Sequence, residues 1–155
     1  MGEGLSGTGQ EARTDFRPVI REALGLPEVK DPALLSPLNL AYLGDNIYEL
    51  VNRSIAVSAG SRSVQKLHRE CLARANAGTQ AKIAGLLYDD FTEEEAAVFR
   101  RGRNAEVHTK AKNATYAEYH DATGLEAVVG YLYLLGRYER ITELLKRGFE
   151  ALGLL

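Results

Sequence analysis

Apolar residues recur along most of this chain at intervals of three and four, which is the spacing of one face of an α-helix. Strand patterns are nearly absent, because valine and isoleucine fall at helical spacings and no Asn-Gly hairpin turn occurs. We therefore expect an all-α fold with a single helical domain. The predicted helices cover residues 15–24, 36–57, 63–75, 79–88, 92–101, 116–135 and 138–151.

Capping signals mark several of the predicted helix ends. Ser36 supplies a capping oxygen directly before Pro37, and proline is favoured at the first position of a helix. Thr92 and Glu95 have the spacing of a capping box. Gly25 is a suitable residue to end the first helix, since glycine readily adopts the left-handed conformation that closes helices.

The helices are separated by short breaks and one longer connection. A break is predicted at residues 76–78, whereas residues 102–114 have no clear period and are predicted to form a loop. The first residues are rich in glycine and lack the apolar segment of a secretory signal. We expect residues 1–14 to be a flexible amino-terminal tail and residues 15–155 to form one domain.

Composition narrows the possible functions. The chain of 155 residues is 45% hydrophobic and 26% charged, so it can bury a core, and its net charge of −2 means that any nucleic-acid binding must come from local charge. A single cysteine, Cys71, excludes an internal disulfide and a zinc site built from several cysteines. No apolar run approaches the ~20 residues that span a membrane, and we expect a cytoplasmic protein with no membrane partner.

Two segments place a carboxylate inside an otherwise apolar helical stretch. Residues 41–49 (Ala-Tyr-Leu-Gly-Asp-Asn-Ile-Tyr-Glu) contain Asp45, and residues 123–133 contain Glu126. Such a charge is costly unless something pairs with it, and a cation is a natural partner. If the two helices pack by these faces, Asp45 and Glu126 converge and can bind Mg²⁺, which needs few protein carboxylates. Ordinary solvated helix faces fit the same spacing, so both interpretations stay open.

Each of these segments also contains a glycine within the predicted helix. Glycine in a helix costs about 1 kcal/mol relative to alanine, so Gly44 and Gly130 require a reason in packing or function. Gly130 lies one turn after Glu126, where it allows another backbone to come close, and Gly44 leaves room beside Asp45.

A basic segment lies between the two acidic motifs. Residues 100–112 contain five lysines and arginines against one acidic residue, Glu106, within a chain whose overall charge is negative. Arginine and lysine suit phosphates, and asparagine suits sugar or base edges. A solvated loop after a helix carboxyl end gives the same composition. The candidates for RNA contact are Arg101, Arg103, Asn104, Lys110, Lys112 and Asn113.

The two acidic motifs resemble those of the ribonuclease III family. Residues 43–49 resemble its signature helix, and residues 126–132 resemble its second acidic motif. The similarity is greatest to the short bacterial branch, Mini-ribonuclease III, in which the catalytic domain stands without a double-stranded RNA-binding domain. It extends over roughly residues 34–148. Further matches in the same order are residues 66–68, 80–82, 101–105 and 112–113.

This resemblance implies a ribonuclease III-like catalytic domain over residues 15–155 and a magnesium-dependent endoribonuclease that cleaves double-stranded RNA. It implies that Asp45 and Glu126 are the catalytic residues that bind the metal, and that the basic segment seats the RNA. It further implies 5′-phosphate and 3′-hydroxyl products, a homodimer, and maturation of the 23S ribosomal RNA precursor. A two-fold protein matches the pseudo-two-fold symmetry of an RNA duplex.

The chain departs from the larger ribonuclease III pattern at two positions. Ala41 and Thr123 stand where that pattern has carboxylates, so only Asp45 and Glu126 are carried over, with Glu49 the best further candidate nearby. The first alternative is therefore a catalytically eroded RNA-binding or ribosome-associated protein of the same fold. The second is a helical interaction protein with no role in nucleic-acid binding. A cleavage assay on duplex RNA with magnesium separates the enzyme from both alternatives.

Overall fold

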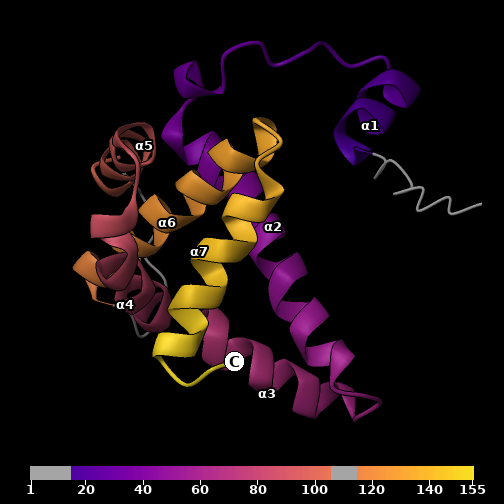
Figure 1. Cartoon of the computed structure of the whole chain (residues 1–155), viewed down its shortest axis with the longest axis vertical. Helices are drawn as coiled ribbons and strands as arrows, with labels where there is room; N and C mark the ends of the chain where they lie inside the picture. Colours follow the sequence, from indigo (N-terminus) through magenta and orange to yellow (C-terminus); the bar gives the residue numbers. More distant parts are fainter. Residues whose placement is uncertain (1–14, 106–114) are drawn as a thin grey trace, which may run out of the picture.

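The described part of the chain, residues 15–105 and 115–155, is entirely helical in the computed structural model shown in Figure 1. It has no strand, which confirms the predicted all-α class. Two short 3₁₀ turns, η1 (Pro32–Leu34) and η2 (Tyr88–Asp90), join some of the helices. The helices are α1 (Phe16–Leu24), α2 (Pro37–Ser58), α3 (Val64–Ala75), α4 (Ala77–Leu87), α5 (Glu93–Arg103), α6 (Tyr116–Leu134) and α7 (Tyr138–Ala151).

Most of the predicted helix ends form as the sequence indicates. Gly25 adopts a left-handed conformation with φ 63° after α1. The capping box at the start of α5 is complete, because the Thr92 hydroxyl accepts from the Glu95 amide while the Glu95 carboxylate accepts from the Thr92 amide. Ser36 differs from its prediction, since its side chain makes no capping hydrogen bond. Pro37 still occupies the first turn of α2, where its missing N–H leaves no donor unsatisfied.

Two predicted boundaries were wrong by a few residues. The break between α3 and α4 is a single residue, Asn76, which ends α3 and caps α4 by accepting from the Thr79 amide at 2.9 Å. Helix α4 therefore begins at Ala77. The predicted loop also starts too early, because Gly102 and Arg103 belong to the last turn of α5. Gly102 is buried against α6, and this tertiary contact outweighs the low helix propensity of glycine.

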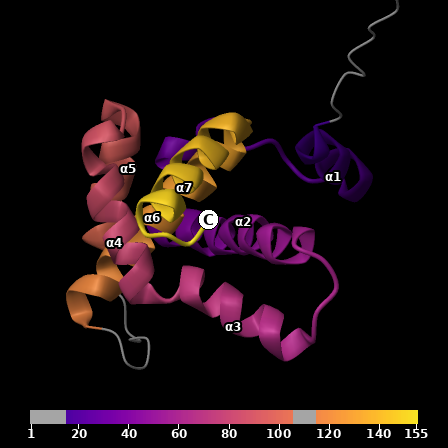
Figure 2. The same cartoon turned by 60° about the horizontal axis from the view of Figure 1, so that its bottom comes forward.

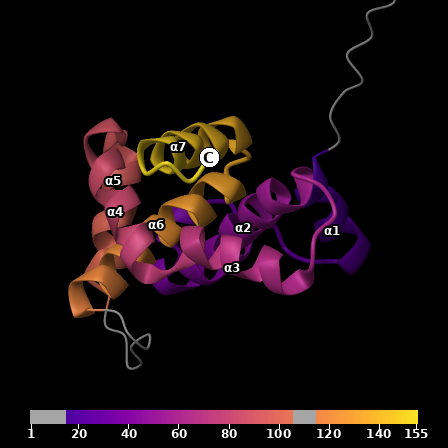
Figure 3. The ribbon, with the colours of Figure 1, turned by 90° about the horizontal axis from the view of Figure 1, so that it is seen from below.

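Helix α6 is the centre of the molecule. It packs most extensively against α2 and also contacts α5, α4 and α7, which surround it in the views of Figure 2 and Figure 3. Leu125, Val128 and Leu132 are almost fully buried there. None of the described helices combines the length and hydropathy needed to cross a lipid bilayer.

Helices α2 and α6 cross with their backbones in contact. A Cβ atom on Gly44 would lie 1.8 Å from the carbonyl oxygen of Glu126, and one on Gly130 would lie 2.0 Å from the carbonyl oxygen of Leu40. Only glycine fits at either position, so the packing reason expected for both glycines is present. At Gly44 the space is taken by the backbone of α6 itself. The crossing brings Asp45 and Glu126, each next to the contact, to the lining of one pocket.

A buried polar network holds α3 against α2. The Arg74 guanidinium donates to the side-chain oxygen of Asn52 at 2.6 Å, and the Asn52 amide donates to the carbonyl of Cys71 at 2.8 Å. The Tyr48 hydroxyl donates to the carbonyl of Arg74. Cys71 is buried within this contact, as expected for a small apolar side chain. These hydrogen bonds offset much of the cost of burying the polar groups and hold α3 in position, although the Nη2 atom of Arg74 is buried without a partner among the described residues.

Helix α1 lies at the edge of the molecule, apart from the other helices (Figure 1). It contains no buried residue. Its main anchor is Arg17, which donates to the carbonyl of Leu134 at 2.6 Å, pairs with Asp15 and lies over the ring of Tyr138. The helix thus rests on the α6–α7 connection and takes no part in the core.

Candidate active site

A pocket opens beside the crossing of α2 and α6. Its walls come from α2, from the end of α3 with the first turn of α4, and from the first half of α6. Asp45 and Glu126 both line it, so the structure brings together the two carboxylates that the sequence analysis singled out. The full lining is Leu38, Ala41, Tyr42, Asp45, Ala75, Ala77, Gln80, Tyr119, Ala122, Thr123 and Glu126.

The two carboxylates interact strongly. The pKa of Glu126 is raised to about 8, first by burial and then by the charge of Asp45, a hydrogen bond with Asp45 and the charge of Glu49. Glu126 is half-buried, whereas Asp45 is exposed at the mouth of the pocket. Two adjacent carboxyl groups disfavour double ionisation unless a positive charge joins them. The two carboxyl groups are therefore expected to ionise together more readily when a cation binds between them.

This donor set fits a small divalent cation. Carboxylate oxygens are the ligands that Mg²⁺ prefers, and Mg²⁺ commonly takes one or two carboxylates and completes its shell with water and phosphate. Among the described residues, no group of three or more histidine, cysteine or acidic side chains is arranged to hold a metal ion. The protein can thus supply Asp45 and Glu126, and the remaining ligands must be water or substrate.

Glu49 lies one turn beyond Asp45 on α2. Its charge contributes to the raised pKa of Glu126, and its carboxylate lies 3.4 Å from the Nε of Arg53. The pKa of the neighbouring Tyr48 hydroxyl is raised by burial and by the charges of Glu126 and Glu49. Glu49 therefore adds negative potential to the site while it is tied to Arg53.

The two positions that depart from the larger ribonuclease III pattern lie in the same pocket. Ala41 is buried and contributes no polar atom. The Thr123 hydroxyl donates to the carbonyl of Tyr119 at 3.0 Å within α6. Neither residue offers a carboxylate, so the acidic part of the pocket consists of Asp45 and Glu126.

Gln80 also lines the pocket, although its segment, residues 80–82, was noted only as resembling the family and Gln80 was not selected as a site residue. It is 5% exposed and shares the buried face of α4 with Ile83, Ala84 and Leu87. A signal was present in the sequence, because Gln80 begins an i, i+3, i+4, i+7 series in which the other three members are apolar. A polar residue on an otherwise apolar helix face is a candidate site residue, and this pattern could have identified Gln80.

The predicted RNA-contact residues are only partly described. Arg101 donates to the carbonyls of Ala33 and Leu35, so it also fixes the segment before α2. The Arg103 guanidinium lies 5.6 Å from the ring centroid of Phe99, and Asn104 ends α5. The end of α5 approaches the pocket wall, since a Cβ on Gly102 would lie 3.3 Å from the carbonyl oxygen of Thr123. Lys110, Lys112 and Asn113 lie outside the described residues.

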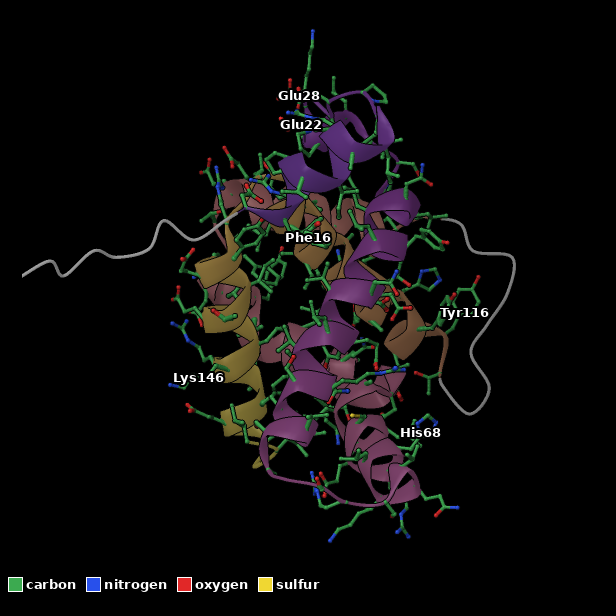
Figure 4. All side chains as sticks on the ribbon, turned by 90° about the vertical axis from the view of Figure 1, so that its right-hand side faces the viewer. Phe16, Glu22, Glu28, His68, Tyr116 and Lys146 are labelled. Atoms are coloured by element: carbon green, nitrogen blue, oxygen red, sulfur yellow. The ribbon has the colours of Figure 1, made fainter. Side chains whose placement is uncertain are left out.

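Figure 4 shows where several labelled side chains lie on the surface. Tyr116, at the start of α6, and His68, on α3, lie on one side of that view, while Lys146 on α7 lies on the other. His68 is exposed and lines a groove between α2 and α3, so it is not part of the pocket that contains Asp45.

The chain is similar to known proteins over most of its length. The family model described as Ribonuclease III domain matches residues 38–137, which include Asp45 and Glu126. A Mini-ribonuclease 3 of Symbiobacterium thermophilum is 47% identical over 116 residues, covering 75% of this chain and 89% of that protein. One of Enterococcus faecalis is 41% identical over 127 residues, covering 81% and 96%. A crystal structure of a Fusobacterium nucleatum protein superimposes with a TM-score of 0.70 at 32% identity, covering 76% and 94%.

Proposed function

The chain belongs to the Mini-ribonuclease III branch of the ribonuclease III family, and from this premise we propose that it is a magnesium-dependent endoribonuclease that cleaves double-stranded RNA. The observation that carries the proposal is the pairing of Asp45 and Glu126 in one pocket, where the pKa of Glu126 is raised to about 8 by burial and by Asp45. Such a pair is costly alone and favourable around a cation.

In this proposal Asp45 and Glu126 bind the metal and orient it toward the RNA backbone. When bound, Mg²⁺ supplies positive charge that polarises a phosphodiester and lowers the pKa of water. The half-buried position of Glu126 limits access of bulk water on one side, while the exposed Asp45 leaves the other side open to a strand. Hydrolysis then gives 5′-phosphate and 3′-hydroxyl ends, as the family resemblance implies.

RNA binding in this proposal depends on backbone contacts. A-form RNA presents its phosphates and 2′-hydroxyls across a wide, shallow minor groove, so a basic surface can hold a duplex with little reading of bases. We assign this role to Arg101, Arg103, Asn104, Lys110, Lys112 and Asn113. The substrate that the resemblance implies is the 23S ribosomal RNA precursor, and the location it implies is the cytoplasm.

We also propose that the protein acts as a homodimer. Tyr42, Leu50 and Val57 project from one side of α2 with exposed fractions of 82%, 64% and 64%. Val57 also lines a groove with the exposed Val64 and Leu72 of α3, and clustered exposed apolar residues are typical of protein interfaces. A two-fold dimer would present one pocket to each strand of a duplex.

Substitution of Asp45 by asparagine tests the proposed activity. We expect Asp45→Asn to lose cleavage of a labelled RNA duplex in Mg²⁺ by at least about a hundredfold, since removal of a metal ligand removes most of the affinity for the ion. Circular dichroism and thermal melting of the variant should match those of the parent. The matched control is Asp89→Asn, which changes an exposed carboxylate on η2 and should cut at the parental rate.

The eroded-enzyme alternative predicts a different result. If the parent binds duplex RNA in a salt-sensitive manner but does not cut it with Mg²⁺, the pocket that contains Ala41 and Thr123 has lost its activity. Parental cleavage by Asp45→Asn would instead show that the assignment of Asp45 is wrong.

A further inference from the structure

Gln80 is a polar side chain in an apolar setting. It lies in the first turns of α4, is 5% exposed, and shares its helix face with Ile83 and Leu87, each of which has no exposed surface. Burial of an amide is unfavourable unless its donors and acceptor find partners. A leucine or methionine at this position would extend the core of α4 at no such cost, so Gln80 is poorly explained by packing.

The Gln80 carboxamide has no hydrogen-bond partner among the described residues. Its backbone amide donates to the carbonyl of Asn76, but no side-chain bond is formed. Its nitrogen and oxygen are also absent from the set of fully enclosed, unsatisfied polar atoms, so they retain an opening. That opening is the pocket that Gln80 lines together with Asp45 and Glu126. The amide is therefore a buried group with hydrogen-bonding capacity left for a ligand.

The surroundings favour an anionic oxygen as the ligand atom. The N-terminal end of α4 reaches the pocket through Ala77, and the positive end of a helix dipole stabilises negative charge nearby. The NH₂ group of a carboxamide offers two donors and adds no charge of its own. In the pocket of a nuclease, the acceptor that meets such donors is a non-bridging phosphate oxygen of the strand held next to the carboxylates.

We propose that Gln80 is a substrate-binding residue whose carboxamide donates a hydrogen bond to a backbone phosphate oxygen of the RNA strand in the Asp45–Glu126 pocket. This inference rests on the proposed ribonuclease function and adds a contact made by the protein rather than by the metal. Gln80 holds the phosphate against the two carboxylates from the α4 side, while the basic residues at the end of α5 hold the strand elsewhere.

Two nearly isosteric substitutions test the contact. Gln80→Met removes both hydrogen-bond donors. Gln80→Glu keeps the size of the side chain but replaces the donors with a negatively charged carboxylate. Because hydrogen bonds to charged groups contribute about 1.5–3 kcal/mol, we expect kcat/KM for duplex RNA to fall about ten- to a hundredfold in Gln80→Met, with most of the loss in KM. Gln80→Glu should lose more, since a carboxylate repels phosphate. The matched control is Gln65→Glu on exposed α3, which should keep the parental kcat/KM.

Two further measurements separate this role from others. Thermal melting of Gln80→Met should equal or exceed that of the parent, because an unsatisfied amide is replaced by an apolar group. Binding of Mn²⁺ without RNA, followed by electron paramagnetic resonance, should be unchanged in Gln80→Met. If Mn²⁺ binding instead weakens in Gln80→Met and tightens in Gln80→Glu, Gln80 is a metal ligand and the phosphate contact is wrong.

The outcomes also distinguish this inference from the function on which it rests. If the parent cuts duplex RNA and Gln80→Met matches its kcat/KM, the Gln80 contact is refuted while the nuclease proposal stands. If the parent itself does not cut duplex RNA with Mg²⁺, the proposed function fails and the inference falls with it.

Discussion

At the scale of single residues, the pairing of Glu126 with Asp45 is a charge arrangement that the folded protein tolerates poorly. The pKa of Glu126 is raised to about 8 by burial and by the neighbouring carboxylate, far above its value in an unfolded chain. A carboxyl group with a raised pKa lowers stability as pH rises, because the unfolded state loses the proton first. The cost of the site therefore grows between about pH 4.5 and pH 8.

This cost predicts a specific effect of removing the charge. We expect metal-free Glu126→Gln to melt at a higher temperature than the metal-free parent at pH 8, with the difference vanishing toward pH 4.5. Addition of Mg²⁺ should raise the melting temperature of the parent and leave that of the variant nearly unchanged, since the cation offsets the paired charges only where both are present. The measurement is thermal unfolding by circular dichroism in a chelator and then in Mg²⁺.

An exposed acidic residue provides the control for this comparison. Glu22→Gln on α1 should show neither the pH-dependent gain nor the loss of the Mg²⁺ response, because Glu22 is exposed and its helix lies outside the core. Equal melting temperatures for the parent and Glu126→Gln at pH 8 without metal would contradict the assignment of a destabilising carboxyl pair.

At the scale of elements, the site depends on how closely α2 approaches α6. The backbone contact at Gly44 leaves 1.8 Å between a hypothetical Cβ and the carbonyl oxygen of Glu126, so no side chain fits without separating the helices. Displacement of α2 would also move Asp45 away from Glu126. Stability and activity are therefore coupled at this crossing.

Substitution of Gly44 by alanine should expose this coupling. We expect Gly44→Ala to lower the free energy of unfolding by about 3 kcal/mol or more and to reduce cleavage, because overpacking against a backbone cannot be relieved by a rotamer change. The control is Gly85→Ala in α4, where a Cβ meets nothing within 4 Å and the gain in helix propensity is up to about 1 kcal/mol. Urea unfolding measures the free energy of unfolding of both variants. A Gly44→Ala protein with parental stability and activity would disprove the tight crossing.

A second link between elements joins α5 to α7. Glu95, 1% exposed, accepts from Arg140 at 2.9 and 3.0 Å, and Arg140 also donates to the carbonyl of Asp90 at 2.7 Å. Burial acts to raise the pKa of Glu95, but the hydrogen bonds from Arg140 and from the Thr92 amide outweigh it and lower the pKa. The pair thus contributes stability above the pKa of an unfolded glutamate and loses it as pH falls through the lower folded value.

Loss of Arg140 should therefore be costly at neutral pH and less so in acid. We expect Arg140→Met to lower the free energy of unfolding by about 3–5 kcal/mol at pH 7, because a buried carboxylate loses its partner. The difference from the parent should shrink in acid, as pH falls below the pKa of an unfolded glutamate, because Glu95 is then protonated in the variant. Arg147→Met, which removes an exposed arginine, should cost no more than about 1 kcal/mol. Urea unfolding at both pH values provides the comparison.

At the scale of the whole molecule, the pockets and surfaces are distributed around the central helix α6. Helices α2 and α3 face outward with exposed apolar residues, while the acidic pocket opens near the start of α6. A dimer through α2 would cover Leu50 and Val57 and leave Asp45 close to the interface on the same helix. The proposed interface and the site would then lie next to each other on one helix, because Tyr42 of the exposed apolar surface also lines the acidic pocket.

The dimer can be tested by placing charge on this surface. We expect Leu50→Asp to shift the protein from dimer to monomer in sedimentation velocity, with unchanged helix content, because a desolvated charge disfavours an apolar interface. Leu86→Asp, at an exposed leucine on α4 that is 49% accessible, is the control and should keep the parental sedimentation coefficient. A monomeric parent would remove the dimer from the proposal without touching the pocket.

The helices, several of their caps and the candidate acidic residues were accessible from the sequence, although Ser36 makes no capping hydrogen bond. Helix formation depends on hydrogen bonds four residues apart and on caps such as Thr92 with Glu95, so local patterns are sufficient to predict it. The motifs around Asp45 and Glu126 were recognised by order and spacing, which are properties of the chain alone. The predictions that were wrong concern helix ends that tertiary contacts determine. Gly102, for example, stays helical because it packs on α6.

Only the tertiary structure decided which distant residues meet. The approach of α2 to α6 depends on atoms of Gly44 and Glu126 that are far apart in the chain, and no local pattern encodes the distance between them. The same packing turned Gln80 toward the acidic pocket and gave Arg101 two carbonyl partners. Composition and periodicity determine which faces must be buried, whereas the close contact of two backbones determines which functional groups share one site.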